Sequence, residues 1–122
     1  HCLRDLTRGG LAAALNEIAA LAQVGIRLDE AAIPISQPVA SACELLGLDP
    51  LYVANEGRLV ALAPATAAEA VLAIMRNHPD GHRAAIIGEV VEDNPGVVEL
   101  RSRLGGSRIL ELLSGEQMPR IC

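Results

Sequence analysis

The first quarter of the chain changes from a helical to a strand periodicity, and this change constrains the fold more than any other feature. Apolar residues between positions 11 and 22 recur every three to four residues, which marks one buried face of a helix. From position 24 to 29 apolar and polar residues alternate, which predicts a strand with one buried face. We therefore expect an α/β (α+β) domain with helices packed on a sheet.

The remaining patterns extend this scheme. A helix over residues 8–22 has Thr7 as its expected N-cap, and the 64–77 helix has Thr66. In the 64–77 helix, four apolar residues are expected to anchor the helix: Val71, Leu72, Ile74 and Met75. The other expected elements are a helix over 39–46 ended by Gly47, and strands over 24–29, 58–63, 84–91, 97–101 and 107–112. Tight turns at 94–96 and 104–106 would join the last three strands into an antiparallel meander.

The composition argues against nucleic-acid binding, a membrane span and a disulfide framework. The 122 residues are 51% hydrophobic, which suits one domain, and Tyr52 is the only aromatic residue, so the core must be aliphatic. Without aromatic stacking platforms and with a net charge of −5, a nucleic-acid-binding surface is not expected. No apolar run approaches the roughly 20 residues of a membrane span. Three cysteines without a CxxC pair indicate a reducing, cytoplasmic setting rather than a disulfide framework.

Gly9 and Gly10 stand at the expected start of the first helix. They leave backbone N–H groups of the first turn uncovered by side chains, an arrangement that can receive an anion. The alternative is that the glycines only let the helix start pack closely against a strand. The Gly-Gly pair alone favours close packing.

A predicted turn at residues 55–57 carries the carboxylate of Glu56 between two strand-like runs. Such a turn can present a carboxylate at the end of a sheet, where loops carry function. The alternative is a solvated turn built from Asn55 and Gly57, with Glu56 as its polar filler. His78 and His82 are separated by a proline and a glycine that prevent a helix, so both are expected in a loop and no metal site is expected.

Residues 114–122 are too polar and too interrupted for a core element and are predicted to form a mobile tail ending in Cys122. Residues 1–113 would form the domain. A thiol at this place is either a reactive group that reaches a neighbouring site or an incidental cysteine. Arg120 either helps to solvate or dock the tail, or lowers the pKa of the thiol. The chain begins at His1 rather than Met, so we expect a fragment or a processed product.

Four stretches together resemble the C-terminal domain of the hydrogenase expression and formation proteins, the HypE family: RDLTRGGLAAALNEIA, LGLDPLYVANEGRLV, IIGEVVED and the terminal PRIC. This family belongs to the superfamily of aminoimidazole ribonucleotide synthetase (PurM), selenophosphate synthetase and thiamine monophosphate kinase. The resemblance implies an α/β sandwich with a mixed, largely antiparallel sheet. It also implies an N-terminal domain, absent from this chain, that binds ATP and Mg and forms a homodimer.

The activity implied by the resemblance is that of a carbamoyl dehydratase in nickel-iron hydrogenase maturation. The terminal cysteine accepts a carbamoyl group from the carbamoyltransferase HypF, and ATP-dependent dehydration converts the S-carboxamide into a thiocyanate. The cyano group then passes to iron on a HypC–HypD scaffold. Cys122 would be the carrier, and the fragment alone would not turn over.

The same resemblance assigns roles to residues in the first and middle stretches. Glu56 takes the position of the family's active-site glutamate, and would abstract a proton if partial burial raised its pKa. Seven residues would border the nucleotide or the modified tail: Arg4, Asp5, Thr7, Arg8, Gly9, Gly10 and Asn55. Two alternatives remain: a non-catalytic docking module of the maturation pathway, and another activity of the superfamily.

Overall fold

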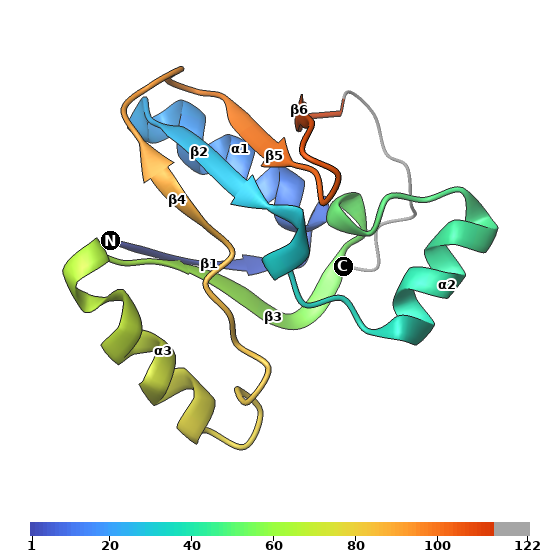
Figure 1. Cartoon of the computed structure of the whole chain (residues 1–122), viewed down its shortest axis with the longest axis horizontal. Helices are drawn as coiled ribbons and strands as arrows, with labels where there is room; N and C mark the ends of the chain where they lie inside the picture. Colours follow the sequence, from blue (N-terminus) through green and yellow to red (C-terminus); the bar gives the residue numbers. More distant parts are fainter. Residues whose placement is uncertain (114–122) are drawn as a thin grey trace.

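The structure is a computed structural model that describes residues 1–113 (Figure 1). Three helices and six strands alternate along this part of the chain, with 3₁₀ turns at Glu30–Ala32, Pro50–Tyr52 and Ala65–Ala67. In chain order the elements are β1 (Cys2–Leu6), α1 (Gly10–Ala22), β2 (Gly25–Asp29), α2 (Gln37–Leu46), β3 (Asn55–Leu62), α3 (Ala68–Asn77), β4 (Gly88–Val91), β5 (Val98–Arg101) and β6 (Ser107–Ile109).

Four strands form a mixed sheet in the order β4-β2-β5-β6. Only the β2–β5 pair is parallel, which confirms the expected mixed, largely antiparallel α+β fold. The predicted meander of the last three strands is wrong, because β2 lies between β4 and β5. The turn after β4 crosses the start of β2, where Gly96 N donates to Val24 O at 2.9 Å, so β5 pairs with the other edge of β2.

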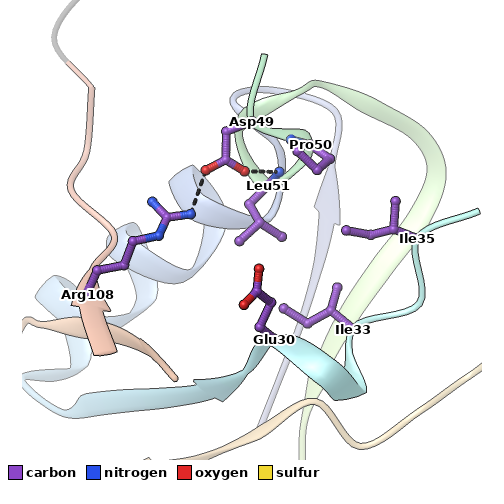
Figure 2. A pocket seen from close by; sticks show the side chains of 7 residues that line it. All are labelled: Glu30, Ile33, Ile35, Asp49, Pro50, Leu51 and Arg108. Atoms are coloured by element: carbon purple, nitrogen blue, oxygen red, sulfur yellow. Dashed lines mark hydrogen bonds and ion pairs between the residues drawn. The ribbon is translucent and has the colours of Figure 1, made fainter. Parts of the chain in front are cut away.

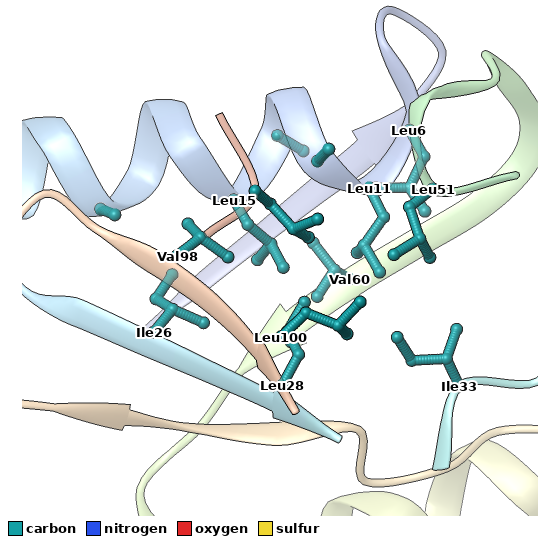
Figure 3. Close-up of a cluster of buried hydrophobic side chains, with 14 residues drawn as sticks. Leu6, Leu11, Leu15, Ile26, Leu28, Ile33, Leu51, Val60, Val98 and Leu100 are labelled. Atoms are coloured by element: carbon teal, nitrogen blue, oxygen red, sulfur yellow. The ribbon is translucent and has the colours of Figure 1, made fainter. Parts of the chain in front are cut away.

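An aliphatic core lies between α1 and this sheet (Figure 3). Strands β2 and β5 turn alternate side chains inward, as the periodicity of residues 24–29 predicted. Small residues on α1 let the helix approach the sheet closely: Ala12, Ala14 and Ala19 are at most 2% exposed. Four larger side chains are fully buried there: Leu15, Val98, Leu100 and Leu110.

The opposite face of the sheet carries an ion-pair ladder across three strands. Arg27 on β2 lies beside Glu89 on β4, at 3.5 Å, and beside Glu99 on β5, at 3.3 Å. The strand register pairs Arg27 directly with both glutamates. Hydrogen bonding from Ser107 and from Arg27 holds the pKa of Glu99 below its usual range.

Strands β1 and β3 form a separate antiparallel pair. Residues 2–6 pair with β3, and Leu6 is buried in the core. The predicted helix start at residue 8 is wrong, because residues 7–9 form a turn in which Gly9 has a positive φ, outside the helical range. Helix α1 therefore begins at Gly10, and its N-cap is Gly9 with φ 66° and no side-chain capping bond, rather than Thr7.

Helices α2 and α3 lie at the sides of the molecule, away from the four-stranded sheet (Figure 1). On α2 only Cys43 is buried, as expected for a small packing residue, and Gly47 ends the helix as predicted. The four predicted apolar anchors of α3 are not buried, and Ile74 is 71% exposed. Thr66 lies in a 3₁₀ turn before α3 and does not cap it.

Strand β4 is shorter than the predicted strand over residues 84–91, and most of it is exposed at the sheet edge. Residue 84 is instead held near α3, where Arg76 Nε donates to Ala84 O at 3.0 Å. His78 and His82 lie in the connection between α3 and β4, as expected. Likewise β6 ends at Ile109, because Leu110 turns into the core. Within residues 1–113 no helix has the length and apolar character to cross a bilayer.

Candidate functional site

The end of β1 and the beginning of β3 meet at one place on the molecule. Leu6, the last residue of β1, pairs with Asn55, the first residue of β3. The turn at residues 7–9, which contains Thr7 and Arg8, therefore begins beside Asn55, the residue that precedes Glu56. Residues about fifty positions apart in the sequence are brought together in this way.

A bulge in β3 presents Glu56. Between the pairs Asp5–Leu59 and Leu6–Asn55, β1 advances by one residue while β3 advances by four, so residues 56–58 project from the ladder. Gly57 has φ 74°, a conformation that favours glycine. The predicted turn at 55–57 is thus an irregularity within one strand, and residues 51–54 before it include part of a 3₁₀ turn rather than a strand. Bulges often re-aim side chains at functional sites.

Glu56 is exposed and Asn55 is half-buried. A carboxylate in this position can accept a proton from a group brought against the bulge. The partial burial that the sequence argument required for Glu56 is not provided by residues 1–113. It would have to come from a ligand or from another part of the protein.

The candidate residues on β1 do not all face this place. Arg4 forms an ion pair with Glu17 of α1, on the side of β1 where Leu6 enters the core. Asp5 belongs to the opposite side of the strand, and Arg8 is exposed in the turn. Arg4 therefore links β1 to α1, while Asp5 and Leu6 pair with the two residues of β3 that bound the bulge.

Gly10 lets two backbone segments approach closely. A Cβ at this position would lie 2.5 Å from Val53 O and 2.7 Å from Leu51 O, and its φ is 66°. Gly10, Leu11 and Ala12 are all buried, so residues 51–53 cover the first turn of α1. Of the two interpretations offered by the sequence, the structure favours close packing over an open anion site at Gly10.

Cys122 and Arg120 lie outside the described residues. Two side-chain hydrogen bonds attach residues 110 and 111, which precede them in the chain, to the domain. Asn16 Nδ2 donates to Leu110 O at 2.8 Å, and Tyr52 Oη donates to Glu111 O at 2.9 Å. Burial, and then the nearby Asp49 carboxylate, raise the pKa of Tyr52. The sequence argument missed both residues. A signal was present, since Asn16 stands within the apolar periodicity of α1 and Tyr52 is the only aromatic residue.

Metal ligands do not gather in the described part of the chain. Residues 1–113 contain no group of three or more His, Cys, Asp or Glu side chains that could hold a metal ion. Cys2 and Cys43 are free thiols there.

These features define an α+β domain with one helix packed on a mixed sheet and a bulge in β3 that carries Glu56. The family model for the C-terminal domain of AIR synthase related proteins matches residues 1–101. The chain belongs to this family, and the resemblance inferred from the motifs is confirmed.

Individual relatives point to one branch of the family. The chain is 61% identical over 120 residues to carbamoyl dehydratase HypE of Cupriavidus necator, covering 98% of this chain and 34% of that protein. It is 51% identical over 120 residues to carbamoyl dehydratase HypE of Escherichia coli, covering 98% of this chain and 35% of that protein. The chain therefore spans about a third of the length of these relatives.

The solved structures that this chain resembles are also HypE proteins. The hydrogenase maturation protein HypE in complex with ATP matches with a TM-score of 0.93 at 48% identity, over 100% of this chain and 38% of that one. A HypE–HypF complex matches with a TM-score of 0.84 at 43% identity, over 89% of this chain and 35% of that one.

Proposed function

We propose that this chain is the C-terminal part of an ATP-dependent carbamoyl dehydratase that converts an S-carboxamide on Cys122 into a thiocyanate for nickel-iron hydrogenase maturation. The observation that carries the proposal is the convergence of Asn55 and Glu56 with the turn after β1, in a chain 61% identical to a carbamoyl dehydratase. Cys122 acts as a tethered substrate rather than as a catalyst.

The reaction removes one water from the amide. Cys122 Sγ first accepts the carbamoyl group and loses its proton. ATP, when bound, supplies the phosphoryl group that turns the amide oxygen into a leaving group. Glu56 takes one proton from the amide nitrogen as the oxygen is phosphorylated and ADP leaves, and passes it to solvent. It takes the second proton as the C–O bond breaks, phosphate leaves and the C≡N bond forms. A carboxylate that projects from a bulge can approach such a nitrogen without displacing the strand around it.

The residues around Glu56 have supporting roles in this proposal. Asp5, Thr7, Arg8, Gly9 and Asn55 border the nucleotide or the modified tail, and Arg8, which is exposed in the turn after β1, would pair with an anionic group there. Arg4 acts through its ion pair with Glu17, and Gly10 through the close approach of residues 51–53. Both therefore position β1 and α1 rather than contact the ligand.

Residues beyond this chain complete the reaction. The part of the protein that precedes it supplies most of the ATP and Mg binding and the homodimer contact, so the chain alone is not expected to turn over. A structure of a HypE–HypF complex among its neighbours supports a HypF-type carbamoyltransferase as the donor. A HypC–HypD scaffold is the proposed acceptor, in the cytoplasm.

The test is the mass of the tail in the full-length protein. With ATP, Mg and the carbamoyltransferase system, Cys122 should gain a carbamoyl group and then lose one water. Cys122→Ser should abolish both changes, whereas Cys2→Ser, which removes a half-buried thiol on β1, should leave both intact. Carbamoylation without dehydration in the unmodified protein would contradict the dehydratase assignment.

A docking module without catalysis is the second candidate, and the surface of α2 favours it. Val39, Leu45 and Leu46 are 46%, 88% and 71% exposed on this helix, which suits a protein contact. If docking were the whole function, Cys122→Ser would retain hydrogenase maturation. Loss of maturation in this variant would exclude the docking module.

A further inference from the structure

A pocket of about 240 Å³ opens between three segments that are distant in sequence (Figure 2). The 3₁₀ turn after β2 contributes Glu30, the segment that follows contributes Ile33 and Ile35, and β6 contributes Arg108. The remaining wall is the turn at residues 49–51. Figure 2 shows the side chains of Leu51, Ile33 and Glu30 pointing towards one another across it.

The charges around this pocket do not balance. Asp49 Oδ2 pairs with Arg108 at 2.7 Å, and Asp49 Oδ1 accepts the backbone N–H of Leu51 at 2.9 Å. Glu30 Oε2 accepts only a backbone N–H, that of Arg103, at 3.1 Å. Within residues 1–113 no cationic side chain lies within ion-pair distance of Glu30. The pocket therefore combines an apolar wall with one carboxylate that lacks a cationic partner.

The root of the tail is anchored beside this pocket. Tyr52, which holds Glu111 through its hydroxyl, directly follows the pocket residue Leu51. Arg108 itself belongs to β6, the last strand before the chain continues to residue 113. The tail thus starts next to the wall of the pocket.

The sequence of residues 114–122 complements the pocket. It contains one cation, Arg120, flanked by three apolar residues: Met118, Pro119 and Ile121. The seven residue steps from 113 to 120 span at most about 25 Å when extended, which is long enough to reach a pocket beside residue 111. Apolar side chains around a single cation match an apolar wall around a single carboxylate.

We propose that this pocket is a docking site for the tail of the same chain, with Arg120 against Glu30 and Met118 and Ile121 against Ile33, Ile35 and Leu51. Docking holds Cys122 two residues beyond the pocket and makes release of the tail a separate step before the thiol is used elsewhere. The docking makes no use of the dehydratase chemistry, so it and the proposed function can fail independently.

The first test follows the methyl NMR signals of Ile33 and Ile35 in the 122-residue chain. Arg120→Gln should shift them, and Glu30→Gln should shift them similarly, because glutamine removes the charge but keeps an acceptor for the Arg103 N–H. Combining the two changes should add little to either one. Glu44→Gln, which removes an exposed carboxylate on α2, should leave these signals unchanged. Additive effects, or no shift in Arg120→Gln, would overturn the proposal.

The second test places a paramagnetic label on Cys122 in a Cys2→Ser background, where the remaining Cys43 is buried. The label should broaden the methyl signals of Ile33 and Ile35 far more than those of Ile74, on α3, which lies on the opposite side of the molecule from α2 and β6 (Figure 1). Undisturbed Ile33 and Ile35 signals would refute docking. Broadening that grows with protein concentration would also refute it, because the tail would then come from a second copy.

Discussion

Glu56 is the residue on which the proposed chemistry depends most directly. In the full-length protein we expect Glu56→Gln to keep the carbamoyl group on Cys122 but to slow its dehydration by about 10²–10⁴-fold, because the amide side chain cannot accept the proton. Mass spectrometry of the tail over time measures this rate. Glu44→Gln on α2 is the matched control and should dehydrate at the normal rate. An unchanged rate in Glu56→Gln would exclude Glu56 as the base.

Gly10 can be tested against Gly47, because both have positive φ but different surroundings. Gly10 has φ 66° with Val53 O and Leu51 O in the place of a Cβ, whereas Gly47 has φ 68° and nothing within 4 Å. Gly47→Ala should lower the free energy of unfolding by about 1–2 kcal/mol through backbone strain alone. Gly10→Ala should lower it by roughly 1–3 kcal/mol more, through overpacking. Equal losses in urea unfolding would show that residues 51–53 move aside easily.

At the scale of elements, the ion-pair ladder on the outer face of the sheet predicts a pH dependence. Because the pKa of Glu99 is lowered in the folded chain, its contribution to stability is present above the unfolded pKa of about 4.3 and is lost as the pH falls through the folded pKa. Glu99→Gln should therefore be less stable than the unmodified chain near neutral pH, and the difference should shrink below about pH 4.3. Urea unfolding at several pH values measures this. Glu92→Gln, at an exposed position outside the ladder, should show a much smaller difference.

Elements with strong local patterns could be predicted from the sequence, and elements made by distant pairing could not. Residues 25–29 alternate and α2 ends at a glycine, so both elements were predictable. Residues 2–6 show no such pattern, and they become β1 only because β3, more than fifty residues later, pairs with them. The position of β2 between β4 and β5 likewise depends on pairing between strands that are distant in sequence, which the turn between β4 and β5 does not reveal.

For the candidate site, the sequence indicated the residues but not the backbone geometry that presents them. The family motifs indicated Glu56 and the residues before α1, and those roles stay predictions. The bulge that presents Glu56 depends on a register between β1 and β3 that the sequence does not show. Asn16 and Tyr52 were missed because their partners are backbone carbonyls near the end of the described chain.

For the whole molecule, the apolar outer face of the β1–β3 pair carries the clearest prediction. Leu3 is 72% exposed and Leu59 is 52% exposed on this face. In the isolated chain we expect this face to cause self-association. Leu3→Thr should reduce self-association in sedimentation experiments and change the free energy of unfolding by less than about 0.5 kcal/mol.

Leu104→Thr provides the control for the self-association experiment. Leu104 is 96% exposed in the turn between β5 and β6, away from the β1–β3 face. If Leu104→Thr reduced association as much as Leu3→Thr, general surface hydrophobicity rather than the β1–β3 face would be responsible.

The bulge in β3 also lets insertions and deletions occur near Glu56 without changing the register of the β1–β3 ladder. Residues 56–58 lie outside the ladder, while residues 59–62 keep their pairing with β1 and bury Val60 in the core. An insertion or deletion within the bulge would therefore alter the reach of the Glu56 carboxylate without turning Val60 towards solvent, as a one-residue slip of the ladder would. The domain can in this way vary the length of the bulge at residues 56–58 while its core remains the same.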